Sequence, residues 1–186
     1  MPLLEIERVL LTEEEIATRV CELGDQITQD YRHVSVEAGN RPNILAIGVL
    51  KGVVPFYADL CRAVKLPLAF DFISVSSYGQ ATSSSGTVRI LKDLDVALEE
   101  YHVLMVEDIV DTGLTLAYLK ENFLRRKPLS FKIVTMLDKP DRRKTPISAD
   151  YNGFTIPDHF VVGYGLDCQE CYRNLPHIAV VRTTEG

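Results

Sequence analysis

Hydrophobic and polar positions follow one another along the chain in two kinds of block, which are short continuous apolar runs and longer stretches with helical spacing. Helical spacing is found in residues 12–31, 53–64 and 114–126. The first stretch opens with Thr12 and has Glu15 three residues later, which is the pattern of a capping box. The second has Pro55 in its first turn, a position that proline tolerates. We therefore predict a helix in each stretch.

The continuous apolar runs predict buried strands, because a strand that is covered on both faces needs no alternation of polar and apolar residues. The runs are residues 43–50, 66–78, 88–94, 102–108, 130–138, 159–165 and 177–181. Strands that alternate with helices indicate an α/β fold with a mainly parallel central sheet. The polar stretch 76–88, "SSYGQATSSSGTV", interrupts this order. It is either a surface hairpin loop or a mobile lid over a site.

The composition is that of one ordinary globular domain spanning residues 1–186, with 46% hydrophobic and 25% charged residues. The formal net charge of −6 disfavours general binding to nucleic acid. No apolar run approaches the roughly 20 residues that span a bilayer. Glu5, Glu7 and Arg8 interrupt the apolar N-terminal stretch, which argues against a secretory signal. We expect a cytoplasmic protein without a membrane partner.

The cysteines are too few for a disulfide scaffold, but two of them form a C-x-x-C motif. They are Cys21, Cys61, Cys168 and Cys171, the last two within "CQEC". A zinc knuckle would need two more ligands, and neither a second C-x-x-C nor a nearby H-x-x-x-H is present. A thioredoxin-like pair opens a helix early in a βαβ unit, whereas this motif lies near the C-terminus. We expect structural or incidental cysteines.

The segment 103–119, "VLMVEDIVDTGLTLAYL", combines an apolar strand, acidic residues and a helix start. Glu107 and Asp108 follow the apolar run, and ligands of open α/β sheets bind beyond such carboxyl ends of strands. The helix that starts near Gly113 offers free N–H groups to a phosphate. The acids would repel a phosphate but accept hydrogen bonds from hydroxyls, or act through a metal. A sugar phosphate satisfies both halves of the segment.

Other phosphate-binding and regulatory classes fit less well. The sequence contains neither G-x-x-x-x-G-K-[ST] nor a G-x-G-x-x-G after a strand. A receiver-like binding module also carries acids at strand ends, but it needs an acidic pair after its first strand. The first predicted strand, "NILAIGVLKG", brings no acids.

The order of apolar run, Glu-Asp, two apolar residues, Asp-Thr-Gly and Thr resembles the phosphoribosyl-pyrophosphate motif of type I phosphoribosyltransferases. Four further segments in the same order resemble the hypoxanthine (hypoxanthine-guanine) phosphoribosyltransferases. They are "VLKGVVPFYADL", "DFISVSSYG", "MLDKPDRR" and "IPDHFVVGYGLDCQECYRNLPHI". The resemblance covers about residues 44–181 and is closer to the bacterial branch.

The resemblance implies a fold and a reaction. The fold is a mainly parallel sheet flanked by helices, with a small hood formed by the N- and C-terminal segments and a flexible lid at about 76–87. The reaction is purine salvage, in which phosphoribosyl pyrophosphate and Mg²⁺ convert hypoxanthine, guanine or both to IMP or GMP, with release of pyrophosphate. The resemblance also implies a homo-dimer or homo-tetramer.

For the phosphoribosyl side, the resemblance makes Asp111 the catalytic carboxylate beside purine N7, and an N-cap is its structural alternative. The ribose and 5-phosphate would be bound by Glu107, Asp108, Ile109, Asp111, Thr112, Gly113 and Thr115. The pyrophosphate would be bound by Leu50, Lys51, Gly52 and Arg173. In the family the Leu50–Lys51 peptide can be cis. The metal would lie near Glu107, Asp108 and Asp167.

For the base, the resemblance makes Lys139 a donor to purine O6, where adenine would present an amino group instead. Phe160 would stack on the base, the backbone of Val161 would read its edge, and Asp167 would border the base pocket. The lid would include Ser77, Tyr78 and Gly79. Cys168 stands where relatives often carry Tyr.

Two alternatives stay open. A regulator with the phosphoribosyltransferase fold could bind RNA, but it should show a basic face and a changed Asp111 position, and neither is present. An enzyme of the same fold could use adenine, xanthine or orotate. Lys139 with Phe160 favours 6-oxopurines, and the choice among hypoxanthine, guanine and xanthine stays open.

Overall fold

The computed structural model describes residues 4–37, 42–77 and 88–183. Its centre is a six-stranded sheet in the order β4-β3-β2-β5-β6-β7. The strands are β2 (Ile44–Leu50), β3 (Leu68–Ser77), β4 (Val88–Lys92), β5 (His102–Val110), β6 (Ser130–Asp138) and β7 (Tyr151–Thr155). All neighbours run parallel except β3 and β4, which pair antiparallel. The predicted α/β class with a mainly parallel sheet is confirmed.

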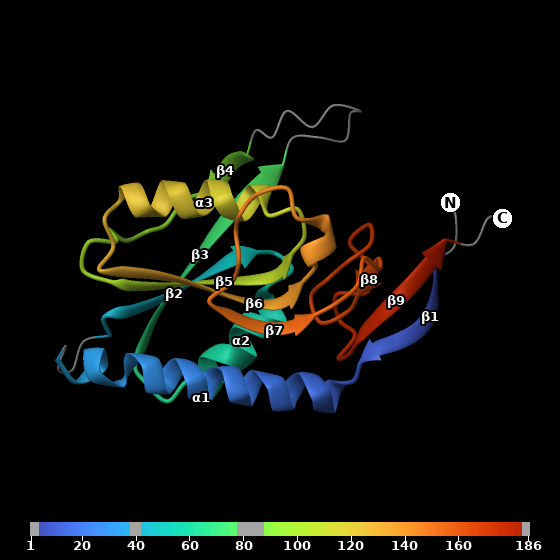
Figure 1. The fold of residues 1–186 in the computed structure, drawn as a ribbon, viewed down its shortest axis with the longest axis horizontal. Coiled ribbons are helices and arrows are strands. Elements are labelled where there is room, and N and C mark those ends of the chain that lie inside the picture. The colour runs from blue at the N-terminus through green and yellow to red at the C-terminus, as the bar shows by residue number, and fades with distance from the viewer. Residues whose placement is uncertain (1–3, 38–41, 78–87, 184–186) are drawn as a thin grey trace.

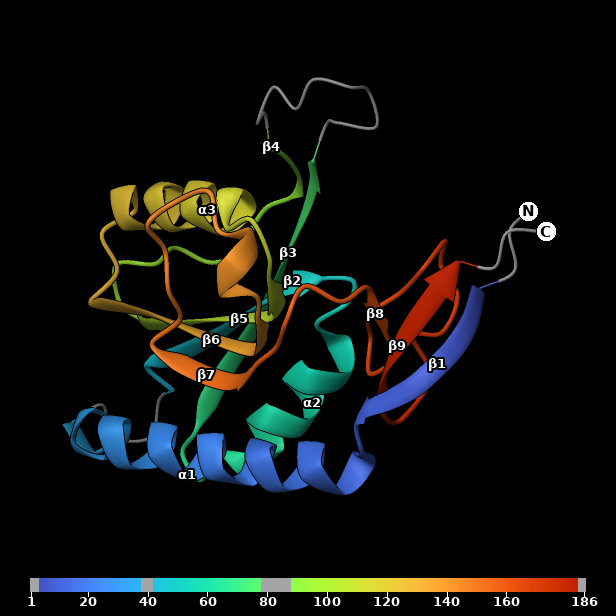
Figure 2. The ribbon, with the colours of Figure 1, turned by 45° about the vertical axis from the view of Figure 1, so that its right-hand side comes forward.

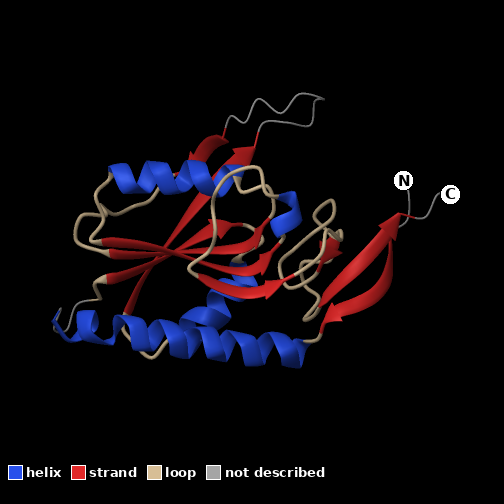
Figure 3. Cartoon of the chain, in the orientation of Figure 1, coloured by secondary structure: helices blue, strands red, loops and turns tan. Residues whose placement is uncertain are grey.

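The helices cover both faces of this sheet (Figures 1 and 3). They are α1 (Glu13–Glu37), α2 (Val54–Ala63), α3 (Leu114–Arg125) and the short 3-10 helix η1 (Pro140–Arg142). Helices α1 and α2 lie on one face, and α3 lies on the other. Alternate residues of β5 therefore enter different cores, with Leu104 and Val106 on the α1 side and Met105 on the α3 side. None of the described helices is long and apolar enough to cross a membrane.

The predicted helices form where their spacing placed them, and α1 extends further than predicted. Its start is the expected capping box: Thr12 N donates to Glu15 Oε2 over 2.8 Å, and Glu15 N donates to Thr12 Oγ1 over 3.2 Å. Its extension beyond residue 31 keeps a buried face, because Val34 follows Tyr31 at helical spacing and both are buried.

A second, three-stranded antiparallel sheet stands beside the main domain and carries both described ends of the chain (Figure 2). We call it the hood sheet; it consists of β1 (Leu4–Leu11), β9 (Ile178–Thr183) and β8 (Val161–Val162). Strand β1 escaped prediction because most of it is exposed and interrupted by charges. Its partner β9 lies at the other end of the sequence, so only tertiary pairing makes it a strand.

Two other strands also differ from the prediction. Strand β7 was not predicted; it pairs with β6, and Arg19 of α1 donates to the Gly153 and Asn152 carbonyls over 2.9 and 2.7 Å. The predicted strand 159–165 shortens to the two residues of β8. The residues that follow, Gly163 to Gly165, all have positive φ and turn the chain away from the sheet.

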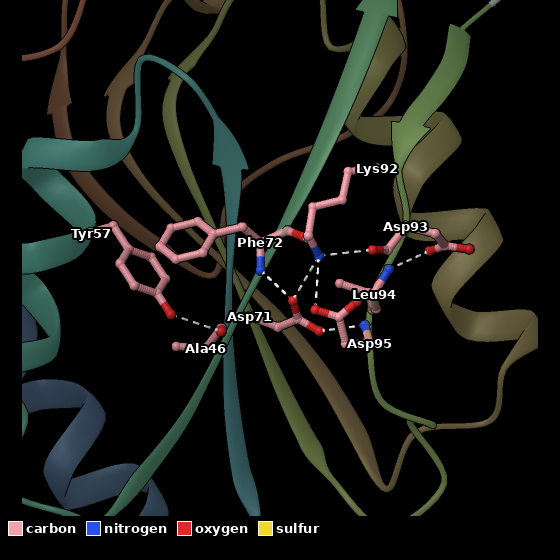
Figure 4. A network of polar contacts seen from close by, with 8 residues as sticks. All are labelled: Ala46, Tyr57, Asp71, Phe72, Lys92, Asp93, Leu94 and Asp95. Atoms are coloured by element: carbon pink, nitrogen blue, oxygen red, sulfur yellow. Dashed lines mark hydrogen bonds and ion pairs between the residues drawn. The ribbon is translucent and has the colours of Figure 1, made fainter.

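The hairpin of β3 and β4 is braced at its base by a polar network (Figure 4). Asp71 Oδ1 accepts from Phe72 N over 2.7 Å and from Lys92 Nζ over 3.3 Å, and Asp71 Oδ2 accepts from Asp95 N over 2.8 Å. The Asp71 side chain is buried. These bonds satisfy both of its oxygens and fix the chain that leaves β4.

Candidate active site

One cavity of about 310 Å³ lies where the carboxyl ends of β2 and β5 meet the loop that follows β8. It is lined by many residues that the sequence singled out: Leu50, Lys51, Gly52, Glu107, Asp108, Ile109, Asp111, Thr112, Gly113, Thr115, Asp167 and Arg173. Apolar side chains that were not predicted, Val49, Val75, Val110 and Leu116, complete the lining. The cavity thus occupies the ligand position of an open α/β sheet.

The acidic pair at the end of β5 is poorly satisfied. Glu107 Oε2 is buried without a hydrogen-bond partner in the described structure. Burial raises the pKa of Glu107 well above its ordinary value, and the neighbouring Asp108 charge raises it further. Burial also raises the pKa of Asp108, to about 6, although Ile109 N donates to Asp108 Oδ1 over 2.8 Å. The pair therefore has capacity to accept hydrogen bonds from ligand hydroxyls or to bind a cation.

Asp111 is oriented by a residue that the sequence analysis missed. Arg142 Nε donates to Asp111 Oδ1 over 3.1 Å, and Arg142 Nη1 lies 3.5 Å from Asp158 Oδ2. Asp111 does not cap α3, because the N-cap position is Gly113 and the Leu114 amide donates to Thr112 Oγ1, over 3.5 Å. Arg142 belongs to the run "DKPDRRK", a pattern that is typical of an ordinary charged surface. Only the fold brings it to Asp111.

The start of α3 is built to approach an anion. Gly113 has φ of 79°, and a Cβ there would lie 2.6 Å from Ile147 Cγ2. Glycine is therefore required for the tight turn between Thr112 and the helix. Gly113, Thr115 and Leu116 line the cavity, and the first turn of α3 contains no acidic residue that would repel an anion there.

The loop after β2 lies directly against the acidic pair. Its Leu50–Lys51 peptide is cis. A Cβ on Gly52 would lie 1.7 Å from Asp108 Oδ2, and a Cβ on Gly165 would lie 1.8 Å from the Gly52 carbonyl oxygen. Two glycines thus allow the backbone after β2 to pass between Asp108 and the loop that follows β8.

Arg173 and Asp167 form the opposite wall of the cavity. Arg173 Nη2 lies 2.8 Å from Asp167 Oδ1, and Arg173 Nη1 donates to the Gly165 carbonyl over 2.8 Å. Asp167 Oδ2 accepts from Glu170 N over 2.8 Å. Lys51 Nζ lies 3.3 Å from Glu170 Oε1, which links this wall to the loop after β2.

Of the four residues expected to bind the purine, Asp167 lines the cavity, whereas Lys139, Phe160 and Val161 do not. Lys139 is buried, and its Nζ donates to the His159 carbonyl over 2.5 Å. The Lys139 amide donates to the Val110 carbonyl over 2.9 Å, which places this residue beside the end of β5. Phe160 is 54% exposed, and Val161 is buried in β8 opposite Val180.

The predicted lid falls mostly on residues 78–87, and the predicted metal ligands lie in the cavity lining. Ser77 ends β3, while Tyr78, Gly79 and the rest of 78–87 lie outside the described residues. Within the described part of the chain, no group of three or more His, Cys, Asp and Glu side chains is placed to hold a metal ion. Glu107, Asp108 and Asp167 line the same cavity without forming such a group.

Comparison with known proteins identifies the class of this site. The model of the phosphoribosyl transferase domain family matches residues 19–169. Hypoxanthine-guanine phosphoribosyltransferase from Bacillus subtilis is 53% identical over 178 residues, which cover 96% of this chain and 94% of that protein. The protein of the same name from Mycobacterium tuberculosis H37Rv is 51% identical over 177 residues, covering 95% of this chain and 87% of that protein.

Solved structures agree. A hypoxanthine phosphoribosyltransferase from Staphylococcus aureus superimposes with a TM-score of 0.87 at 47% identity, covering 95% of this chain and 92% of that one. A Trypanosoma cruzi hypoxanthine phosphoribosyl transferase gives a TM-score of 0.88 at 48% identity, with the same coverage. The chain belongs to the phosphoribosyltransferase family, in the branch of the hypoxanthine-guanine phosphoribosyltransferases. The resemblance inferred from the motifs is confirmed.

Proposed function

We propose that this protein transfers the 5-phosphoribosyl group of phosphoribosyl pyrophosphate to N9 of hypoxanthine, guanine or both. The products are IMP or GMP and pyrophosphate, and the role is purine salvage. The observation that carries the proposal is a single cavity with two unlike halves. A partly unsatisfied acidic pair, Glu107 and Asp108, lies next to a helix start suited to a phosphate.

Glu107 and Asp108 accept hydrogen bonds from the ribose hydroxyls in this proposal. The partnerless Glu107 Oε2 gains a donor, which removes the cost of its burial. The 5-phosphate lies on the backbone of residues 112–115, where Gly113 permits close approach. The negative charge beside the ribose also favours the cationic character that develops at C1 as the leaving group departs.

The charged residues that line the cavity fit a magnesium diphosphate. Lys51 and Arg173 supply positive charge, and Glu107, Asp108 and Asp167 supply carboxylate oxygens, the ligands that magnesium prefers. The unsatisfied oxygen of Glu107 and the raised pKa values of the pair are what a site for a cation would show without it. When bound, magnesium would neutralise the departing pyrophosphate.

Asp111 acts as the general base at purine N7. Arg142 holds Asp111 Oδ1, so the carboxylate has a defined orientation at the cavity. Loss of the N7 proton makes N9 a better nucleophile while the bond to C1 forms. Arg142 is a positioning residue here, because it reaches the reaction only through Asp111.

Lys139 selects the base. Its ammonium now donates to the His159 carbonyl, and it would donate to O6 of a 6-oxopurine instead. Adenine would oppose it with an amino group, another donor, which disfavours adenine. The exposed ring of Phe160 is available to stack on the base, and Val161 would read its edge through the backbone.

The proposal includes features that follow from the resemblance. Residues Ser77, Tyr78 and Gly79 belong to a lid that excludes water during transfer. The hood sheet completes a single domain over the site.

The protein acts in the cytoplasm as a dimer or tetramer. Exposed Phe70 and Leu91 on β3 and β4 support self-association, which size-exclusion chromatography with light scattering measures.

The test is an initial-rate assay with phosphoribosyl pyrophosphate, magnesium and one base at a time: hypoxanthine, guanine, xanthine or adenine. We expect turnover of hypoxanthine or guanine and none of adenine. Asp111→Asn should lower kcat about 10²-fold or more, because a positioned base contributes at least that much. Asp141→Asn, an exposed neighbour of Arg142, is the matched control and should retain wild-type rates. No turnover with any base, with phosphoribosyl pyrophosphate still bound, would overturn the proposal.

A further inference from the structure

The C-x-x-C motif forms a tight turn on the wall of the cavity, in the loop between β8 and β9. Cys168 N donates to the Cys171 carbonyl over 3.2 Å, and Cys171 N donates to the Cys168 carbonyl over 3.0 Å. The two cysteines are thus a directly opposed antiparallel pair. The intervening Gln169 and Glu170 both have positive φ, 52° and 64°, as in a type I′ hairpin turn.

This geometry suits a disulfide that forms and breaks easily. Residues opposed in a hydrogen-bonded antiparallel pair have Cα atoms about 5.5 Å apart, within the span of roughly 4.4–6.8 Å found in disulfides. Their side chains leave the same face of the hairpin, with Cβ atoms about 4.5–5.5 Å apart. A disulfide needs about 3.8 Å between Cβ atoms. Formation of the disulfide must therefore draw the two Cβ atoms together, which strains the turn. Strained disulfides are the ones that are readily reduced.

Both thiols are free and open to reagents: Cys171 is exposed and Cys168 is partly buried. A metal does not explain the pair, because no group of three or more suitable ligands exists among the described residues. A thioredoxin-type arrangement does not explain the pair either, because the motif spans a hairpin turn and starts no helix.

The turn is connected to the proposed pyrophosphate residues on both sides. Asp167 directly precedes Cys168, and Arg173 follows two residues after Cys171. Between the cysteines, Glu170 lies 3.3 Å from Lys51 Nζ and 3.4 Å from Arg173 Nη2. Its amide donates to Asp167 Oδ2 over 2.8 Å. A contraction of the turn acts directly on the ion pairs that position Lys51, Asp167 and Arg173.

We propose that Cys168 and Cys171 form a reversible disulfide by exchange with a low-molecular-weight disulfide, and that this closure weakens binding of phosphoribosyl pyrophosphate. The sulfur of exposed Cys171 attacks the small disulfide, whose S–S bond breaks and releases one small thiol. Cys168 then attacks the mixed disulfide and releases the second small thiol. The two cysteine protons end on the two small thiols, and the two electrons lost by the cysteines reduce the small disulfide.

The effect of the disulfide on binding of phosphoribosyl pyrophosphate rests on the proposed function. The formation of the disulfide does not. A displacement of about 1 Å at a site residue can cost up to about 10²-fold in rate. We expect a smaller effect at this rim, roughly a tenfold rise in KM for phosphoribosyl pyrophosphate. KM for the base should change less, because Lys139, Phe160 and Val161 lie outside the turn and only Asp167 adjoins it.

The experiment uses the full-length protein equilibrated in mixtures of oxidised and reduced glutathione. Free thiols are then blocked, and mass spectrometry of the peptide that contains residues 168–171 measures the disulfide. KM for phosphoribosyl pyrophosphate is measured in the same samples. Cys168→Ser/Cys171→Ser should keep the reduced-state KM in every mixture. Cys21→Ser/Cys61→Ser is the matched control and should respond as the wild type does, because those cysteines lie on α1 and α2.

We expect the peptide to lose two hydrogen atoms as oxidised glutathione increases, with KM rising in parallel and both changes reversed by dithiothreitol. The proposed Cys168–Cys171 disulfide would be overturned if both thiols persisted at every glutathione ratio, or if only mixed disulfides with glutathione formed. A complete disulfide with unchanged KM would overturn its coupling to substrate. An enzyme without turnover would overturn the proposed function alone, because the peptide mass still reports the disulfide. Cys171→Ser by itself serves as a second variant and should also prevent closure.

Discussion

Two groups of carboxylates on the central sheet, Asp71 on β3 and the pair Glu107 and Asp108 on β5, differ in how their oxygens are satisfied. Asp71 receives three hydrogen bonds, from two backbone amides and from Lys92 (Figure 4). Glu107 Oε2 is buried and receives none from the described residues. Neither Glu107 nor Asp108 forms an ion pair within the described part of the chain.

The difference separates a structural acid from acids kept for a ligand. The partners of Asp71 come from its own strand, from the last residue of β4 and from the chain that leaves β4, so the fold supplies everything it needs. Glu107 and Asp108 lie at the cavity, and their neighbours leave hydrogen-bonding capacity unused. Such a site costs stability in the free protein, and binding of ligand offsets that cost.

The largest expected effect comes from neutralising the site acids. In Glu107→Gln/Asp108→Asn, we expect kcat/KM for phosphoribosyl pyrophosphate to fall by about 10²–10⁴-fold. Hydrogen bonds to charged groups contribute about 1.5–3 kcal/mol each, and both acids lose that charge. The melting temperature of the ligand-free protein should rise at neutral pH. Asp71→Asn is the control, with unchanged KM. A double variant that is less stable than the wild type would contradict the comparison.

The opposite behaviour is expected of the structural acid. Asp71→Ala leaves the Asp95 amide without its acceptor and removes one acceptor of the Lys92 ammonium, which keeps the Phe72 and Asp93 carbonyls and Asp95 Oδ2. The free energy of unfolding should fall by about 3 kcal/mol. Urea denaturation followed by circular dichroism measures this loss. Lys92→Met should cost less, because the Lys92 side chain is 42% exposed. If the two variants were equally destabilised, Asp71 would not be the centre of the network.

A pH titration sharpens the comparison further. The pKa of Asp108 is raised to about 6 in the folded protein, against an ordinary value of 3.8. The folded state therefore holds a proton that the unfolded chain releases, and stability falls as the pH rises through this window. From about pH 4 to about pH 7, the ligand-free wild type should lose on the order of 2 kcal/mol relative to Asp108→Asn. Parallel stability curves for the two proteins would refute the raised pKa.

The smallest effect is expected at the capping box, where an exposed carboxylate is satisfied locally. Thr12→Ala removes the hydroxyl that accepts from Glu15 N, and should cost about 1 kcal/mol of unfolding free energy. Activity should stay at the wild-type level, because no residue of α1 lines the cavity. Thr18→Ala, which loses only a bond from its hydroxyl to the Glu14 carbonyl, should change stability less. Equal losses in both variants would argue against a special role for the cap.

The sequence by itself determined the features that depend on neighbours along the chain. The start of α1 at Thr12, the buried strands β2, β5 and β6, and the strand–turn–helix segment 103–119 were all predicted from spacing and turn chemistry. Much of the cavity lining was predictable for the same reason, because residues 107–115 are contiguous and carry their motif within one segment.

Only the tertiary structure decided what depends on partners far apart in sequence. Strand β1 exists because β9 pairs with it, and β7 exists because β6 and α1 hold it. The approach of Gly52 to Gly165, the contact of Arg142 with Asp111 and the link from Lys51 to Glu170 all join distant segments. The secondary-structure propensity of a short segment does not reveal such contacts. They contribute free energy only after the sheet and its loops have come together.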